Sequence, residues 1–501
     1  MLKIISKVTV QAIDYLFKEG ISGNTVALAF LRLTAIFWRG PIGLFEFRRG
    51  NISACLNHLE HTHFHVGATS LCLDRAREAS RVLTNGYSVN QSSNALHPFN
   101  YKVLFACHSS GYFLRNGYAV RTAQIANALN HTGIQVFACT RLGYPWDLFG
   151  SDIDERPEST IHDGLEYQHF FDVKKRIYGP DSKYINAYTE KLFIEALKKN
   201  VSVIHAYSSY SNGLAANAAA SRLNILSVYE MRGLWHLSRA VKEPSYESSE
   251  HFTYCEQMEL AAANGADRVV TLNMSMKNWC IDRGVNPNKI SIVPNGIVPN
   301  GEFDRSVKSP VEDKHFQLGF IGSITEYEGL EDLIHAISLL TKLGHNIHCK
   351  IAGTGEFLHP LRRLCKTLKL TDNVEFLGHI EGQKILGFYR SLDLAVVVRK
   401  NSTMTRLIPP LKLAESLSLG VPTLITDLPA LREILGERAS LFIACPDNPS
   451  SICNQIIEIM GKPDESEALS GLLKNRIDRE YNWQTNSSNY LKIYAHNLCT
   501  T

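Results

Sequence analysis

The chain has 501 residues, too many for one ordinary hydrophobic core, and this length indicates two or three domains. Hydrophobic residues make up 45% and charged residues 20% of the sequence, as in soluble globular proteins, and a net charge of +3 is too small to indicate a nucleic-acid partner. The eleven cysteines stand singly, which favours free thiols over disulfides or a zinc site. No signal peptide is evident, and the longest early apolar run, 26–38, contains Arg32 and is too short to cross a bilayer, so we expect a cytoplasmic protein.

Residues 1–98 are predicted to form short helices, among them 8–18, 25–38 and 68–83, with a polar linker at 90–94. Basic side chains outnumber acidic ones in this extension. Two interpretations stay open. The extension either contacts a protein partner or the inner face of a membrane, as a peripheral attachment, or it is a helical cap packed on the next domain.

Strands and helices alternate regularly from residue 101 onward. Short apolar runs separated by helical segments are typical of a doubly wound parallel sheet in an α/β fold. We assign residues 99–296 to a first Rossmann-like domain, with strands predicted at 102–107, 135–140, 203–206, 226–230, 268–272 and 290–294.

A second series of the same kind follows, and we assign it to residues 310–480. The segment 295–309 is rich in Gly, Asn and Pro and is predicted to be a hinge, and residues 481–501 are expected to hold a final helix. Two such domains in tandem are expected to face a cleft, with ligands at the carboxyl ends of the strands. The second set of strands is predicted at 318–322, 349–353, 374–378, 394–398 and 423–426.

The most informative segment runs from Leu407 to Pro422. Two prolines are expected to open a helix there, with Lys412 in its first turn and Glu415 three residues later. The unpaired N–H groups and the dipole at such a helix end favour phosphate, Lys412 adds positive charge, and Glu415 is placed to accept hydrogen bonds from a sugar hydroxyl. The segment resembles the nucleotide-sugar-binding helix of retaining glycosyltransferases of the GT-B fold, family 4 type. Taken alone, it also fits an ordinary capped helix on a parallel sheet.

The loop after the first strand adds to this resemblance. It leads through Gly117 into a helix that carries Arg121, and it lacks the Gly-x-Gly-x-x-Gly pattern of a dehydrogenase dinucleotide site. Its Gly-Tyr-Ala-x-Arg-Thr sequence, followed by the segment 140–147, resembles a bacterial subgroup of family 4. The alternative for the loop glycines is a purely structural role.

Residues 229–235 resemble the Glu-x-Arg-Gly-Leu-Trp segment of the same subgroup, a loop that faces the transferred sugar and the acceptor. The resemblance implies that Arg232 stabilises the leaving phosphate or holds an anionic acceptor group, and that Glu230 and Trp235, with Arg121, lie on the acceptor side. The structural alternatives are that Glu230 orients Arg232 and that Trp235 packs in a core.

Residues 322–330 align with the family's Gly-Arg-…-Lys-Gly segment but depart from it. Ser323 replaces the arginine and Glu328 replaces the lysine, both of which are positively charged in the family pattern. Arg406 stands near the first glutamate of the family's Glu-x7-Glu pair, of which only the second is present. We therefore expect the three cations that stand nearest the predicted phosphate site to replace the missing charge, namely Arg399, Lys400 and Lys412.

We expect catalysis to depend on Arg232, as the resemblance implies, and on Arg399 and Lys412, because of their positions after a strand and at a helix start. Two further loops, 353–356 and 376–380, resemble those that seat the base and ribose, although they do not identify the nucleobase. No metal-binding motif is apparent, so neither a metal nor a cofactor is expected. The residues expected to bind the donor are Gly117, Gly322, Ser323, Gly353, Gly355, His379, Ile380, Lys400, Leu411 and Glu415.

The resemblance, which covers about residues 101–495, implies a retaining, metal-independent glycosyltransferase. Its expected partners are a nucleotide-sugar donor and a glycan or lipid-linked acceptor, in the setting of surface polysaccharide synthesis. The departures at Ser323, Glu328 and Arg406 motivate an alternative, a catalytically inactive GT-B subunit that binds nucleotide or a partner transferase. A nucleotide-sugar epimerase of the same fold is a weaker alternative.

Overall fold

The computed structural model describes most of the two predicted Rossmann-like domains and part of the extension. The predicted helices at 8–18 and 25–38, the linker at 90–94 and most of the predicted hinge lie outside the described residues. The described ranges are 40–62, 68–88, 95–114, 117–149, 157–171, 179–297, 315–436 and 439–495.

The chain divides into two compact units. The first runs to Val270 and also includes Cys280–Ser291 and the chain from Leu491, and the second comprises Thr271–Trp279 and Ile292–Tyr490. This division places the extension in one unit with the first Rossmann-like domain. The chain passes from the second unit back to the first within the last helix, α21 (Trp483–Tyr494).

The first unit is built on an eight-stranded sheet in the order β3-β4-β2-β1-β5-β6-β7-β8. The central strands are buried on both faces, as is usual in a parallel sheet covered by helices. The edge strands β3 and β4 pair with each other in the antiparallel direction. The strands are β1 (Lys102–Cys107), β2 (Gln135–Thr140), β3 (Ser159–His162), β4 (Leu165–Gln168), β5 (Val203–Tyr207), β6 (Leu226–Met231), β7 (Arg268–Thr271) and β8 (Ile290–Ile292).

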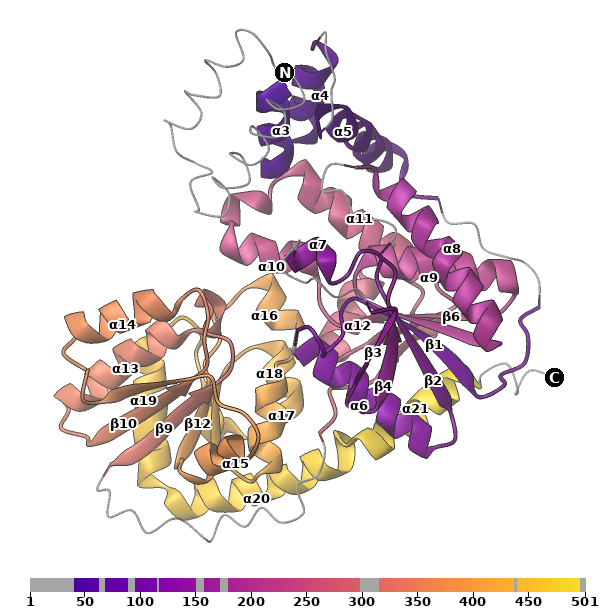
Figure 1. Cartoon of the computed structure of the whole chain (residues 1–501). Helices are drawn as coiled ribbons and strands as arrows, with labels where there is room; N and C mark the ends of the chain where they lie inside the picture. The colour runs from indigo at the N-terminus through magenta and orange to yellow at the C-terminus, as the bar shows by residue number, and fades with distance from the viewer. Residues whose placement is uncertain are drawn as a thin grey trace. The chain divides into compact units, whose positions relative to one another are not determined.

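Helices cover the two faces of this sheet. α8 and α9 pack against the central strands, and Figure 1 shows α6 on the other side of them. Both α8 and α9 end at an asparagine, Asn200 and Asn224, in the left-handed conformation that commonly closes a helix. The helices are α6 (Gly117–His131), α7 (Trp146–Phe149), α8 (Asp181–Lys199), α9 (Tyr210–Leu223), α10 (Trp235–Lys242), α11 (Glu250–Gly265) and α12 (Met274–Ile281), the last of which lies mostly in the second unit.

The described part of the extension packs on the first Rossmann-like domain. Its helices α3 (Gly40–Arg49), α4 (Ile52–Glu60) and α5 (Ala68–Asn85) lie beside α11 (Figure 1). Arg75 of α5 is buried and forms an ion pair with Asp181 at the start of α8, with 3.2 Å between Nη2 and Oδ2. The same carboxylate oxygen accepts hydrogen bonds from the hydroxyl groups of Tyr210 and Tyr254. A buried charge with this many partners fixes the extension to its domain.

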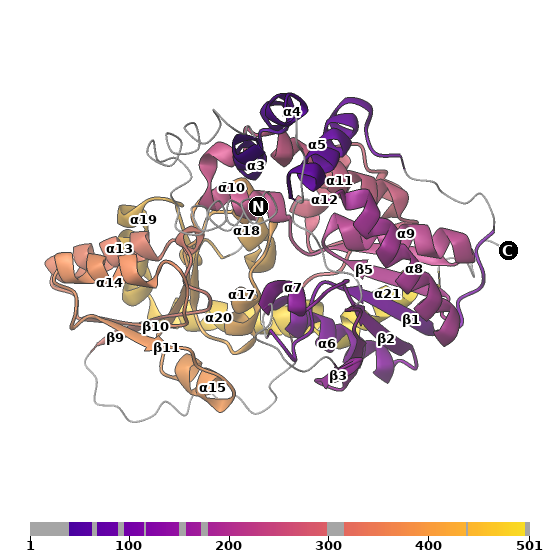
Figure 2. The ribbon, with the colours of Figure 1, turned by 45° about the horizontal axis from the view of Figure 1, so that its top comes forward.

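The second unit contains a six-stranded sheet in the order β11-β10-β9-β12-β13-β14, and every pairing in it is parallel. Figure 2 shows α13 and α14 over one face of β9 and β10, and α15 beyond the other face. Its strands are β9 (Phe316–Ile321), β10 (Ile347–Ala352), β11 (Val374–Gly378), β12 (Leu394–Val397), β13 (Thr423–Thr426) and β14 (Ile443–Ala444). Its helices are α13 (Leu330–Lys342), α14 (Leu358–Thr367), α15 (Gln383–Arg390), α16 (Thr403–Leu407), α17 (Leu411–Ser418), α18 (Pro429–Leu435), α19 (Pro449–Gly461) and α20 (Pro463–Glu480), with part of α21.

The predicted strands agree with the structure to within two residues at each end, and two details differ. The prolines do not form the first turn of α17: the helix begins at Leu411, and Pro410 before it has the extended conformation of a capping residue. The edge strands β3 and β4 and the short β14 were not predicted. Within the described residues, no helix is long and apolar enough to span a membrane.

Arg75→Ala should destabilise the first unit and loosen the extension, because it leaves the buried Asp181 carboxylate without its cation. Loss of one partner of a buried ion pair costs about 3–5 kcal/mol, although the two tyrosine hydroxyl groups that remain reduce this cost. The matched control is Arg77→Ala on the same helix, whose exposed pair with Glu60 contributes less than about 1 kcal/mol. Urea unfolding and limited proteolysis of residues 40–88 measure both effects. Equal behaviour of the two variants would contradict the anchoring role of Arg75.

Candidate functional site

The start of helix α17 lies in the second unit and carries two of the predicted site residues. Lys412 is the second residue of this helix, and its side chain is largely buried. Glu415, one turn further on, has an exposed side chain. The helix therefore begins with a buried ammonium group, which its own dipole disfavours unless an anion lies nearby.

Three loops at the carboxyl ends of β9, β10 and β11 fit closely together beside this helix. The N–H of Gly322 donates a hydrogen bond to the carbonyl oxygen of Ala352, and the N–H of Gly353 donates one to the carbonyl oxygen of Gly378. Gly353 has φ +140°, and a Cβ there would lie 1.8 Å from the carbonyl oxygen of Gly322, so no side chain fits at this position. The loops thus meet through backbone contact at Gly322 and Gly353, and a role of Gly322, Gly353 and Gly355 in donor binding stays a prediction.

Glu328 lies between two of the predicted cations. Nζ of Lys412 donates a 2.9 Å hydrogen bond to one carboxylate oxygen, and Nε of Arg399 lies 3.8 Å from the other. Nη1 of Arg399 also donates to the carbonyl oxygen of Ile408 at 2.7 Å. We call Glu328, Arg399 and Lys412 the Glu328 cluster. It contains two cations and one anion, and all three side chains are largely buried.

The ionisation of these groups reflects both burial and mutual attraction. Burial alone would raise the pKa of Glu328, but the charges of Lys412 and Arg399 outweigh it and hold this pKa below its ordinary value. Burial lowers the pKa of Lys412, against the opposing attraction of Glu328. An added anion beside Lys412 would favour its charged form.

The other predicted donor residues of this unit are more exposed. Nζ of Lys400 lies 3.3 Å from Oε2 of Glu331, so Lys400 forms an ion pair near the surface and does not join the Glu328 cluster. Ser323 is exposed at the end of β9. His379 is exposed and lies 3.8 Å from Glu381, whereas Ile380 is partly buried.

In the first unit, the predicted acceptor-side residues surround Glu230, at the end of β6. The fully buried carboxylate of Glu230 lies 2.7 Å from Nε of Arg232, 3.0 Å from Nη2 of Arg121 and 3.2 Å from Nε2 of His205. Nδ1 of His205 lies 2.7 Å from the hydroxyl of Tyr494 in α21. Burial alone would raise the pKa of Glu230, but the two arginines and His205 hold it well below its ordinary value.

Arg232 is held inside this unit on several sides. Nη1 donates to Oγ1 of Thr122 at 2.6 Å, and the guanidinium carbon lies 3.5 Å from the centre of the Tyr207 ring. Its backbone N–H donates to Ser208. These contacts support the alternative in which Glu230 orients Arg232, and a direct catalytic role of Arg232 stays a prediction.

Trp235 is half exposed, so the alternative that it packs in a core does not hold. Its ring lies 4.8 Å from that of His108, which follows β1, at an interplanar angle of 35°. Trp235 thus lies half exposed beside His108, and its acceptor role stays a prediction.

The sequence did not identify every residue that shapes these two sites. His205 and Tyr207 were treated only as parts of a strand, although their spacing puts both on one face of β5, and Tyr207 pairs in register with Glu230. Glu328 was recognised only as a departure from a family pattern. Glu328 stands where the family pattern has a lysine, and the sequence places Arg399 and Lys412 in the same predicted site. A carboxylate that replaces a cation beside two other cations was the signal for a new ion pair.

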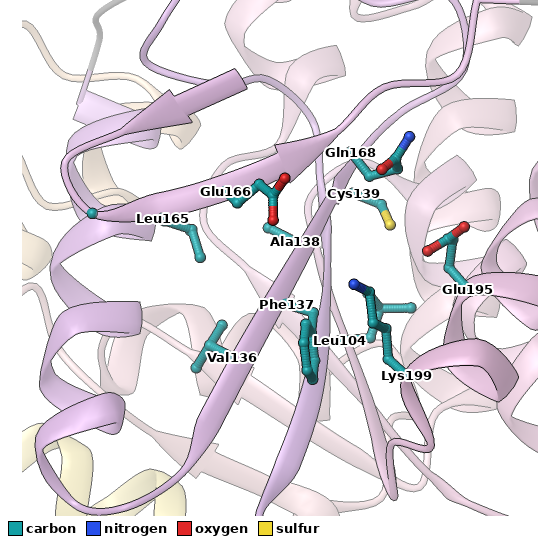
Figure 3. Close-up of a pocket in the computed structure, with 11 residues that line it drawn as sticks. Leu104, Val136, Phe137, Ala138, Cys139, Leu165, Glu166, Gln168, Glu195 and Lys199 are labelled. Atoms are coloured by element: carbon teal, nitrogen blue, oxygen red, sulfur yellow. The ribbon is translucent and has the colours of Figure 1, made fainter. Parts of the chain in front are cut away.

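A separate cavity of about 200 Å³ lies in the first unit, between strands β2 and β4 and the end of α8. Figure 3 shows Glu195 and Lys199 of α8 facing side chains of these strands, and Nζ of Lys199 lies 5.0 Å from the centre of the Phe137 ring. None of the lining residues is a predicted site residue. Within the described ranges, no three His, Cys, Asp or Glu side chains are grouped so as to hold a metal ion.

Comparison with known proteins gives matches in both domains. Residues 116–296 match the model of the glycosyl transferase 4-like domain, and residues 302–472 match that of glycosyl transferases group 1. An uncharacterized glycosyltransferase of Methanocaldococcus jannaschii is 25% identical over 250 residues, which are 47% of this chain and 62% of the relative. Mannosylfructose-phosphate synthase of Agrobacterium fabrum is 23% identical over 321 residues, 57% of this chain and 68% of the relative. The chain thus spans less than two thirds of the first of these relatives.

Solved structures show the same fold at low identity. Sucrose-phosphate synthase from Thermosynechococcus elongatus has a TM-score of 0.62 and 15% identity, covering 80% of this chain and 100% of that one. Anabaena HepE in complex with UDP has a TM-score of 0.59 and 14% identity, with coverages of 79% and 100%. The expected GT-B fold is therefore confirmed. With a family model matching each of its two Rossmann-like domains, the chain belongs to the family 4 type glycosyltransferases.

Proposed function

We propose that the protein is a retaining glycosyltransferase that moves a sugar from a nucleotide-diphosphate donor to an acceptor hydroxyl, in surface polysaccharide or glycoconjugate synthesis. The Glu328 cluster carries this proposal, because it concentrates one net positive charge at the start of α17. A helix start with an excess cation is suited to a diphosphate. The structurally similar Anabaena HepE was solved with UDP and with UDP-glucose, which supports a donor of this kind.

The proposed roles follow from the charge that develops in the reaction. Breaking the bond between the anomeric carbon and the diphosphate puts negative charge on the leaving oxygen, which Lys412 and Arg399 stabilise electrostatically. By the family resemblance, the leaving phosphate takes the proton of the acceptor hydroxyl, so the protein supplies no nucleophile. Glu415 accepts hydrogen bonds from the donor ribose, and Trp235 offers a face on which an acceptor sugar stacks.

A second candidate is a catalytically inactive subunit that binds nucleotide. The observation that favours it is the pairing of Lys412 with Glu328, since this carboxylate offsets half of the positive charge of the cluster. Thermal-shift screening of the whole chain against nucleotide sugars and nucleoside diphosphates identifies the bound nucleotide, because ligands stabilise the folded state. Donor hydrolysis and transfer assays with that nucleotide sugar then separate the two candidates. Binding without turnover under any acceptor would overturn the proposed activity.

Lys412→Gln should lower the turnover number by about 100-fold or more, as does loss of one preorganised donor to a developing oxyanion in other enzymes. The Michaelis constant for the donor should change less, because the charge matters most as the diphosphate leaves. Lys462→Gln, which neutralises an exposed lysine paired with Glu458, is the matched control. Steady-state transfer kinetics decide the point, and an unchanged rate in the Lys412 variant would place the catalytic charge elsewhere.

Glu415→Ala should weaken donor binding by roughly tenfold to 150-fold, the loss expected from a charge-assisted hydrogen bond worth roughly 1.5–3 kcal/mol. Isothermal titration with the identified nucleotide sugar measures this loss. Glu458→Ala, at an exposed position of α19, should bind the donor as the unaltered chain does. A folded Glu415 variant with full donor affinity would remove this residue from the site.

Transfer should continue after exhaustive chelation, because side-chain cations supply the charge that a divalent metal supplies in other transferases. The measurement compares initial rates with and without EDTA. An activity that is lost on chelation and restored by Mn²⁺ or Mg²⁺ would show that the proposed charge assignment is incomplete.

A further inference from the structure

The carboxylate of Glu328 lies between the two cations of the Glu328 cluster. Its two oxygens lie toward different cations, at 2.9 Å from Nζ of Lys412 and 3.8 Å from Nε of Arg399. The three side chains of the cluster are largely buried, so these charges are poorly screened by solvent. A ligand phosphate that approaches Lys412 therefore interacts with Glu328 as well as with the two cations.

The cluster also contains a buried hydrogen-bond donor that no acceptor among the described residues satisfies. Nε of Arg399 is buried and, among the described residues, has no hydrogen-bond acceptor within reach, since Glu328 is too far from it for a hydrogen bond. The ammonium group of Lys412 lies 2.7 Å from the place that a Cβ on Gly322 would occupy and 4.0 Å from the centre of the Phe320 ring. A buried donor and an excess positive charge beside a helix start indicate that the cluster is completed by an anion.

We propose that Glu328 is a resident counter-anion of the donor site, and that it discriminates against the nucleoside diphosphate product relative to the nucleotide-sugar donor. This inference rests on the proposed function and extends it to the release of product. Glu328 is then a positioning residue, because it acts on the ligand through the cations it pairs and through its own fixed charge.

The chemistry of the transfer supplies the difference in charge. In the donor, both phosphates are esterified, and the diphosphate carries about two negative charges. Transfer breaks the bond between the anomeric carbon and the phosphate oxygen, joins that carbon to the acceptor oxygen, and passes the acceptor proton through the leaving phosphate to solvent. The product diphosphate then has a free terminal phosphate and carries about three negative charges near neutral pH.

A fixed negative charge repels the product more strongly than the donor, because the Coulomb energy is proportional to the ligand charge. With a lysine at position 328, three cations would hold the more negative product most tightly. With Glu328, the site keeps enough positive charge to bind the donor, and product leaves sooner. Product release limits the turnover of many enzymes, and where it does so here, such a bias raises the overall rate.

The test compares Glu328→Gln with the unaltered full-length chain. The probes are the nucleotide sugar and nucleoside diphosphate found in the thermal-shift screen, with UDP-glucose and UDP as the first pair. The variant should bind the nucleoside diphosphate about tenfold more tightly or better, since it removes a charge close to the ligand, whereas donor affinity should rise by a smaller factor. Product inhibition should tighten in the same ratio.

Two further variants make the outcome specific. Glu328→Asp keeps the charge and should restore the ratio of product to donor affinity even if a shorter side chain weakens the fold. Glu458→Gln neutralises an exposed carboxylate on α19 and should leave the ratio unchanged. Equal factors for product and donor in Glu328→Gln, or a ratio that Glu328→Asp does not restore, would overturn the inference alone. An unaltered chain that binds no nucleotide would overturn the proposed function as well.

Discussion

Burial of the parallel strands on both faces places the charged groups of both candidate sites near the ends of the strands. Strands such as β5 and β12 are covered along their whole length, so charged side chains have room only where the strands end. Glu230 stands near the end of β6, and Arg399 stands just after β12. Each is a buried ion that needs partners of opposite charge, and the surrounding loops supply them.

Each domain meets this need by placing one buried carboxylate between two cations. In the first unit, Glu230 is one anion held by Arg121, Arg232 and His205, and the contacts of Arg232 with Thr122 and Tyr207 keep the network inside the domain. In the second unit, Glu328 likewise faces two cations, and Nε of Arg399 has no hydrogen-bond acceptor among the residues that the structure describes. The networks differ in their place, since the second stands at the start of helix α17 and the first at the end of strand β6.

The sequence predicted the parallel strands well, because continuous apolar runs such as those of β1, β12 and β13 are a direct consequence of two-sided burial. It did not predict β3 and β4, which are short, partly polar and held at the edge of the sheet by pairing rather than by an apolar pattern. The first residue of α17 was also misplaced, since a proline suits the first turn of a helix as well as the extended residue before it.

The resemblance to a family identified the segments of the candidate site but not the ion pairs between them. That Lys412 meets Glu328 depends on how the turn before α13 folds toward the start of α17, and no local pattern encodes it.

The turn after Glu328 has a consequence for how this site evolves. Gly329 has φ +70°, and a Cβ on it would lie 1.8 Å from the carbonyl oxygen of Val398, so the backbone of the turn is fixed by contact with the loop after β12. The direction of the side chain at position 328 is therefore set by its neighbours, whatever residue stands there. Glutamate and lysine codons differ by a single base. One nucleotide substitution can thus reverse the charge at position 328 while the backbone of the turn stays the same. The net charge of this site can therefore change in evolution without a change in its fold.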